Sequence, residues 1–318
     1  MAAFQSVTSV VLRILASRVV RVTFVVASVT LGVVAVVTEW DDIRPALARL
    51  SLPLLGTAFV ATLGGLMASM VMWRLLLAGL GSALPYRVAA RVLFVSQLGK
   101  YLPGSVWPAL AQMELGRDHG VPRRRSMTVF ALLMLFSLTS GLVVASGTLP
   151  LAATEETRRF WWALLLTPVL LAIVHPRVLN PLLDWLLRLV RRPQLERPVT
   201  WVMSAQATLV GVIQWLCYGL HTWLLAVALG ADPLPTLPLA VGGFALAWCV
   251  GYLVVITPAG LGVREVALVA ALSPVLAPAD ALVLAIASRA IVTVADLVVA
   301  GSSAVSMRAA RADEPSTS

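Results

Sequence analysis

The sequence has few charged residues and almost no cysteine, and these shortages exclude several classes of protein. Only 12% of its 318 residues are charged, whereas soluble domains carry about 25%. The two cysteines, Cys217 and Cys249, lie in apolar runs without metal-ligand spacing, so we expect buried, reduced thiols and neither a disulfide framework nor a metal site. The sequence also lacks a nucleophile–base–orienter set, a phosphate loop and any nucleic-acid module. It therefore predicts no enzyme, no cofactor and no nucleic-acid partner.

Long apolar runs dominate the remainder of the chain. Hydrophobic residues make up 59% of the sequence, and the mean hydropathy is +0.92. Runs of about 20 such residues are typical of helices that cross a membrane. We therefore predict an all-α integral membrane protein, a polytopic bundle of six to eight transmembrane helices. The predicted spans are Val19–Val37, Leu52–Leu80, Met127–Leu149, Phe160–Val174, Trp201–Leu229 and Asp280–Ser306. The count becomes eight if Leu237–Ile256 spans and Leu261–Leu272 returns.

The distribution of basic residues predicts the orientation. With the N-terminus in the cytoplasm, most of the 24 lysines and arginines lie inside, including the cluster Arg123–Arg125. Acidic residues such as Asp42, Glu155 and Asp232 then lie outside. This asymmetry follows the positive-inside rule. We expect a multi-pass protein of the inner (plasma) membrane with both termini cytoplasmic, and we attribute the net charge of +9 to topology and anionic headgroups.

Two segments place helix-breaking residues and charge beside apolar helices. They are Gly99–Pro108, with the sequence GKYLPGSVWP, and Ile256–Glu265, with the sequence ITPAGLGVRE. A single shift in residue number places Pro103 on Pro258. The same shift places Leu142-Val143-Val144-Ala145 on Leu297-Val298-Val299-Ala300, so both apolar runs contain the sequence LVVA at matching positions. Paired Gly/Pro-interrupted segments in two halves of a chain point to a transport site. The alternative is two ordinary loops and a chance match between valine-rich helices.

The predicted orientation makes the two halves an inverted repeat within one transmembrane domain, 1–318. Repeat one covers about 52–150 and its hairpin enters from the cytoplasm; repeat two covers about 200–307 and its hairpin enters from the exterior. Irregular backbone at membrane depth survives only where protein or water covers it, so we predict two re-entrant hairpins. Segment 176–198 reads as an interfacial linker helix because its leucines form one stripe. Segment 309–318 is predicted to be a disordered tail.

These motifs resemble those of the lysylphosphatidylglycerol synthase transmembrane family. The resemblance rests on Gly99–Gly104 followed by Trp107, and on Pro258-Ala259-Gly260-Leu261-Gly262-Val263-Arg264-Glu265, and it covers nearly the whole chain. It implies a lipid translocator that moves an aminoacylated phospholipid or another large-headgroup lipid between leaflets. Lipid-modifying members carry an aminoacyl-transferase domain after the membrane part, whereas this chain stops at Ser318. We therefore do not expect lipid synthesis.

Charged side chains at membrane depth supply the candidate site, since each costs several kcal/mol unless it is paired or hydrated. Basic groups there are suited to a lipid phosphate, and acidic groups to a cationic headgroup or a proton. Glycines and prolines would shape the hairpin turns. The alternative role for the charges is structural, as buried ion pairs: Arg289 with Asp296, and Glu265 with an arginine. The predicted substrate-binding residues are Lys100, Tyr101, Pro103, Gly104, Trp107, Glu114, Pro258, Gly260, Gly262, Arg264, Glu265, Arg289 and Asp296.

Three functions fit this set of residues. The first is translocation of an aminoacylated phospholipid, a polyprenyl-phosphate-linked lipid or another large-headgroup lipid, which requires a hydrated cavity between the hairpins. The second is a membrane scaffold or accessory subunit of a glycosyltransferase or lipid-modifying enzyme, which expects fully paired charges in a dry core. The third is an integral-membrane transferase that uses Glu114 or Glu265 as a base. Membrane lipids are the expected partners, and the sequence leaves a homodimer open.

Overall fold

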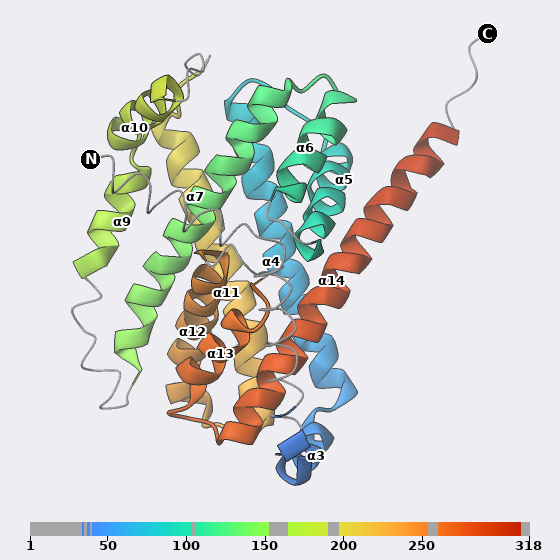
Figure 1. Cartoon of the computed structure of the whole chain (residues 1–318), viewed down its shortest axis with the longest axis vertical. Coiled ribbons are helices and arrows are strands. Elements are labelled where there is room, and N and C mark those ends of the chain that lie inside the picture. The colour runs from blue at the N-terminus through green and yellow to red at the C-terminus, as the bar shows by residue number, and fades with distance from the viewer. Residues whose placement is uncertain are drawn as a thin grey trace, which may run out of the picture.

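The computed structural model describes residues 34, 37–38, 40–102, 106–152, 165–189, 197–253 and 260–312, with backbone alone for 306–312. Within these ranges the chain forms helices and no strand, and the helices make one elongated bundle (Figure 1). The helices are α3 (Trp40–Arg49), α4 (Leu52–Gly79), α5 (Tyr86–Gln97), η1 (Leu98–Tyr101), α6 (Trp107–Arg117), α7 (Arg123–Thr148), η2 (Leu149–Leu151), α9 (Leu166–Val174), α10 (Pro176–Leu189), α11 (Trp201–Ala228), α12 (Pro233–Leu253), α13 (Val263–Leu272) and α14 (Pro278–Ala312).

Five helices are long and apolar enough to cross a membrane. They are α4, α7 together with η2, α11, α12 and α14 as far as Val305. Four of them confirm predicted spans, and α12 corresponds to Leu237–Ile256, the segment whose crossing the sequence left open. A helix of this length satisfies all its backbone groups internally, which lipid requires. The protein is thus a polytopic helical membrane protein.

The two other predicted spans, Val19–Val37 and Phe160–Val174, lie partly outside the described residues. Val19–Val37 lies outside the described residues except at Val34 and Val37. Of Phe160–Val174, residues 160–164 lie outside the described residues. The described part contains α9, which together with α10 is long and apolar enough to cross a membrane, with a bend of 61° between the two helices. His175 at the bend has an extended backbone, with ψ of 132°, because the following Pro176 disfavours the helical conformation there.

Small residues allow the central helices to approach closely. A Cβ on Gly65 of α4 would lie 2.7 Å from the ring of Tyr218 on α11, and one on Gly219 of α11 would lie 2.6 Å from Val241 Cα on α12. Glycine at such contacts lets helix backbones pack in membranes. This packing holds α11 between α4 and α12 and presents Tyr218 to the interior.

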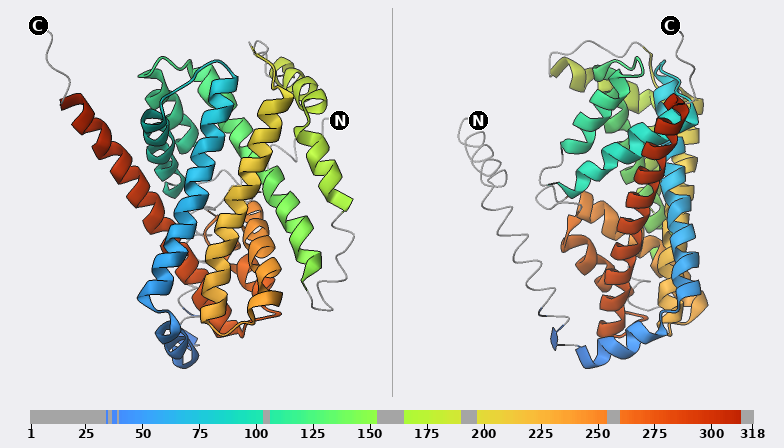
Figure 2. Two further views of the ribbon diagram at one scale, coloured as in Figure 1. Left: turned by 180° about the vertical axis from the view of Figure 1, so that it is seen from behind. Right: turned by 90° about the vertical axis from the view of Figure 1, so that its right-hand side faces the viewer.

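The two interrupted segments occupy opposite halves of the bundle (Figures 1 and 2). Helices α5 and α6, joined through η1, lie in the half that contains the N-terminus of α7. Helices α12 and α13 lie in the half that contains α3. The pairs are unequal, since α12 has 21 residues and α5 has 12. The described parts of the two interruptions, η1 and the start of α13, face the middle of the bundle beside α14 (Figure 1).

The ends of the bundle also differ in charge. The end at the N-terminus of α7 carries Arg87, Arg117 and Arg124, all exposed. The opposite end carries the acidic residues Asp42 and Asp232. This separation is the one on which the predicted orientation rests. Helix α14 continues to Ala312, so the predicted disordered tail at 309–318 is wrong for its first four positions, and 313–318 lie outside the described residues.

Candidate functional site

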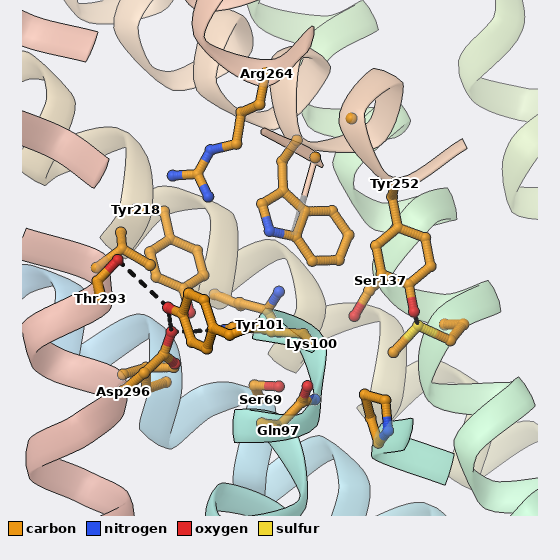
Figure 3. A pocket seen from close by; sticks show the side chains of 18 of the residues that line it. Ser69, Gln97, Lys100, Tyr101, Ser137, Tyr218, Tyr252, Arg264, Thr293 and Asp296 are labelled. Atoms are coloured by element: carbon orange, nitrogen blue, oxygen red, sulfur yellow. Dashed lines mark hydrogen bonds and ion pairs between the residues drawn. The ribbon is translucent and has the colours of Figure 1, made fainter. Parts of the chain in front are cut away.

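A cavity of about 330 Å³ lies where the two helix pairs meet. Its walls come from both halves of the chain: η1 and α5 on one side, α12 and α13 on the other, and the long helices α4, α7, α11 and α14 between them (Figure 3). Cavities formed by discontinuous helices from two halves are the usual location of transport sites. The charged side chains that line it are Lys100, Arg264, Arg289 and Asp296.

Asp296 joins the first helix pair to the last long helix. Its carboxylate accepts a hydrogen bond of 2.6 Å from the hydroxyl of Tyr101 and forms an ion pair of 2.6 Å with Lys100 Nζ. Asp296 is only 3% exposed, so its charge requires such partners. Tyr101 also lies 3.5 Å from Thr293 Oγ1, one turn earlier on α14. Arg289, Thr293 and Asp296 follow one another at spacings of four and three residues, which places them on one face of α14, and all three line the cavity.

Glu265 ties α13 to α14. Its Oε1 lies 2.5 Å from Arg289 Nη1, and its Oε2 accepts a 2.7 Å hydrogen bond from the backbone N–H of Gly262. Gly262 precedes the first residue of α13 and has φ of 85°, a conformation that favours glycine. Arginine therefore pairs with Glu265, as the structural alternative expected, whereas the alternative pairing of Arg289 with Asp296 does not occur.

Arg264 differs from the other cations of the cavity. Its guanidinium points into the cavity (Figure 3) and lies over the ring of Phe244, 4.8 Å from the centroid. Among the described residues it forms no ion pair, because the adjacent Glu265 lies on another face of α13 and is engaged by Arg289. The cavity thus contains a positive group held by an aromatic ring rather than by a carboxylate.

Aromatic residues of α12 form one wall, and the sequence analysis did not include them. Phe244, Trp248 and Tyr252 line the cavity, and the rings of Trp248 and Tyr252 are stacked with centroids 4.8 Å apart. Their spacing of four residues places them on one helical face, so this signal was present in the sequence. It was hidden by the uniform hydrophobicity of the run around it.

Uncharged polar side chains complete the lining. Ser69, Gln97, Ser137 and Gln214 come from α4, α5, α7 and α11. Gln214 is 3% exposed, and its Oε1 is buried without a hydrogen-bond partner in the described part of the chain. A buried amide oxygen without a donor costs free energy, and because Gln214 is a lining residue, a donor that enters the cavity and reaches this oxygen would supply the missing partner.

The remaining predicted site residues have varied positions. Gly260 lines the cavity with φ of 68°, and a Cβ there would lie 3.2 Å from the backbone of Gly251. Glu114 does not line the cavity; it is exposed and pairs with Arg117 and Arg123, at 3.5 and 2.7 Å. Glu114 lies in the second half of α6, toward the basic end of the bundle, and the sequence alone did not reveal this position.

Trp107 also lies away from the cavity lining, at the exposed start of α6, where 44% of it is accessible. Pro103, Gly104 and Pro258 lie outside the described residues. Seven of the predicted residues therefore either line the cavity or pair with a residue that does: Lys100, Tyr101, Gly260, Arg264, Glu265, Arg289 and Asp296. Gly262 in turn donates its backbone N–H to Glu265.

The fold and cavity define a polytopic helical membrane protein whose polar site is assembled from two interrupted helix pairs. Residues 13–300 match the lysylphosphatidylglycerol synthase TM region. The chain belongs to this family, which confirms the resemblance seen in its motifs. No curated protein matches the chain. Membership indicates a role in the metabolism or transport of membrane lipids.

Proposed function

We propose that this protein translocates lipids between the leaflets of the inner membrane, with the cavity as the headgroup site. Family membership supports a lipid substrate. The cavity supports transport, because it contains charged and polar groups between helices that span the bilayer. Both interrupted helix pairs are re-entrant in this proposal, and the two halves form an inverted repeat.

The guanidinium of Arg264, which has no ion-pair partner in the described part of the chain, carries the proposal. In a scaffold, a charge without a partner in the interior would only destabilise the fold, because burying it costs several kcal/mol. The other charges do fit a scaffold, because Lys100 pairs with Asp296 and Arg289 with Glu265. Among the described residues Arg264 forms no ion pair; its guanidinium lies over the ring of Phe244 and faces the cavity (Figure 3). A charged group that lacks an internal ion-pair partner is typical of a binding site.

The pairs that hold the cavity together suggest how it opens. Lys100 and Tyr101 link η1 to α14 through Asp296, and Arg289 links α14 to α13 through Glu265, in addition to the packing of α5 and α13 on α14. In this proposal, breaking either ion pair loosens one helix pair against α14 while the other stays closed. Alternating access requires such independent gates on opposite sides of one site. The sequence contains no ATP-binding motif, so transport in this proposal is passive or ion-coupled.

The transferase alternative requires a carboxylate base beside the substrate. Glu114 is exposed and pairs with two arginines, and Glu265 is engaged by Arg289 and by the N–H of Gly262. Neither carboxylate lines the cavity. Both candidates are therefore poorly placed for catalysis, and the translocator fits the described residues better.

Reconstitution tests the proposal. The purified protein is inserted into liposomes that contain an acyl-labelled fluorescent phospholipid, and a membrane-impermeant quencher reports how fast inner-leaflet lipid reaches the outside. We expect faster exchange than in empty liposomes. Arg264→Gln should remove the acceleration, whereas Arg87→Gln, which deletes an exposed cation of α5, should retain it. If phospholipids and polyprenyl-phosphate-linked lipids all exchange at the protein-free rate, the scaffold becomes the better proposal.

A further inference from the structure

We infer that the cavity selects a lipid headgroup that is anionic and carries hydroxyl groups, a phosphodiester of glycerol or of a single sugar, and disfavours a cationic aminoacylated headgroup. This inference rests on the proposed function and narrows its substrate. It follows from three properties of the cavity: which charges remain unpaired, which hydrogen-bonding groups face inward, and how much room they enclose.

The charges favour an anion. A cationic headgroup needs a carboxylate, but Asp296 is occupied by Lys100 and Tyr101, and Glu265 by Arg289 and the Gly262 N–H. Displacing either internal cation leaves that cation unpaired at membrane depth, which is unfavourable. Arg264 has no carboxylate partner among the described residues, and a guanidinium binds two phosphate oxygens at once. A phosphate therefore gains a partner without removing one.

The uncharged lining favours hydroxyl groups. Gln214 Oε1 is buried and accepts no hydrogen bond within the described ranges, so it requires a donor. A phosphate diester has no donor of its own, whereas glycerol and sugar hydroxyls do. The stacked rings of Trp248 and Tyr252 form a flat apolar surface on the same cavity, and such a surface suits the C–H face of a polyol. Ser69 and Gln97 add further polar groups (Figure 3).

The volume favours a small headgroup. A cavity of about 330 Å³ lies at the lower end of the range of roughly 300–1,000 Å³ for ligand sites. This volume accommodates a phosphate with a glycerol or one sugar ring. Leu102 and Tyr252 line the cavity and are also exposed at the protein surface. The acyl chains of the lipid would leave the site past these two side chains.

Binding of short-chain lipids tests the selectivity independently of transport. The full-length protein in detergent is titrated with dihexanoyl phosphatidylglycerol, the anionic but hydroxyl-free dihexanoyl phosphatidylmethanol, the zwitterionic phosphatidylcholine, the lysylated phosphatidylglycerol, and a short polyprenyl phosphate. We expect phosphatidylglycerol to bind most tightly and the lysylated lipid roughly tenfold or more weakly. Soluble glycerol phosphate separates the two sources of the phosphate group; if it binds as tightly as the lipid, the site takes a free phosphate ester and the inference is overturned.

Two variants separate charge from hydroxyl recognition. Arg264→Gln should weaken binding of both anionic lipids about tenfold to a hundredfold, the usual effect of losing a charged hydrogen bond. Gln214→Leu should reduce the preference for phosphatidylglycerol over phosphatidylmethanol and leave the latter unchanged. Arg87→Gln should alter neither. Circular dichroism and the melting temperature of each variant establish that it is folded before its affinity is compared.

The binding and liposome experiments together distinguish two kinds of failure. Selective binding without lipid exchange would overturn the proposed function and retain the headgroup assignment. Exchange of lysylated and unmodified phosphatidylglycerol at equal rates, or a preference for the lysylated lipid, would overturn the headgroup assignment and retain translocation. Equal effects of Arg264→Gln on anionic and zwitterionic lipids would also overturn it, because Arg264 would then act on the fold rather than on the phosphate.

Discussion

Lys100 Nζ lies 2.6 Å from Asp296 Oδ2, although the two residues belong to opposite halves of the chain. The carboxylate also accepts a hydrogen bond from Tyr101. The buried charge of Asp296 is therefore compensated by Lys100 and Tyr101 of the 3₁₀ turn η1. This contact lies on one side of the cavity and links the first helix pair to the last long helix, α14.

Replacing Asp296 should destabilise the protein. Asp296→Asn leaves Lys100 without its carboxylate, and we expect a loss of about 1–3 kcal/mol, less than the 3–5 kcal/mol of a fully buried pair because Lys100 is partly exposed. The melting temperature of the purified protein measures the change. Glu114→Gln is the control, since the surface pairs of Glu114 should contribute no more than about 1 kcal/mol. Asp296→Asn combined with Lys100→Met should recover part of the loss; equal losses in the single and double variants would show that the pair does not interact.

Glu265→Gln should separate structure from transport. The variant leaves Arg289 unpaired and so lowers the melting temperature, but it adds positive charge beside the cavity. We expect lipid exchange in liposomes to continue at least at the wild-type rate for anionic lipids, whereas Arg264→Gln abolishes it. If Glu265→Gln abolishes exchange in folded protein, Glu265 contacts the headgroup and the structural role assigned to its pair is incorrect.

Gly260 should tolerate substitution poorly. Its φ of 68° disfavours any residue with a Cβ, and the added atom would press on the backbone of Gly251 at 3.2 Å. We expect Gly260→Ala to cost about 1–2 kcal/mol and Gly260→Val to cost more, measured by thermal unfolding. Gly147 in α7 is the matched control, because a Cβ there meets nothing within 4 Å and alanine favours a helix. Equal melting temperatures for the two alanine variants would mean that the turn after α12 is an ordinary loop.

Cysteine labelling should place the two ends of the bundle on opposite sides of the membrane. Asp232 and Arg124 are both exposed, and the positive-inside rule puts Arg124 in the cytoplasm. In intact cells, an impermeant thiol reagent should label Asp232→Cys from outside and Arg124→Cys only after the membrane is opened. The chain without an added cysteine reports the background from Cys217 and Cys249. Labelling of both positions from one side would remove the basis of the inverted repeat.

Much of the fold could be read from the sequence because each spanning helix is a local property. Apolar length alone identified α4, α7, α11 and α14, since a helix in lipid needs about 20 apolar residues and satisfies its own backbone. For Phe160–Val174 the same rule did not reveal the bend of 61° at His175, where α9 ends before Pro176 and α10 begins. It left α12 undecided, because the run ends at the interrupted segment and its length alone did not show whether it crosses.

The candidate site could be read only in part. Unusual residue types singled out Lys100, Arg264, Glu265, Arg289 and Asp296, because a charge in an apolar run is conspicuous. The aromatic wall of α12 was missed, because aromatic residues are ordinary in such a run. Glu114 was included among the predicted site residues, but it does not line the cavity. The sequence around a charged residue near a helix end is the same whether its side chain faces the interior or the basic surface.

The sequence by itself determined that this chain crosses a membrane several times and that two Gly/Pro-containing segments interrupt its apolar runs. It also identified the charged residues that lie within apolar runs and therefore require a partner or water. Tertiary structure alone decided the pairing: Asp296 meets Lys100, Glu265 meets Arg289, and Arg264 is left facing the cavity without a described carboxylate partner. Helical periodicity places side chains on a face, but it does not rank partners that come from distant helices. Distance and direction after packing select them, because an ion pair at membrane depth forms only where both groups can reach each other.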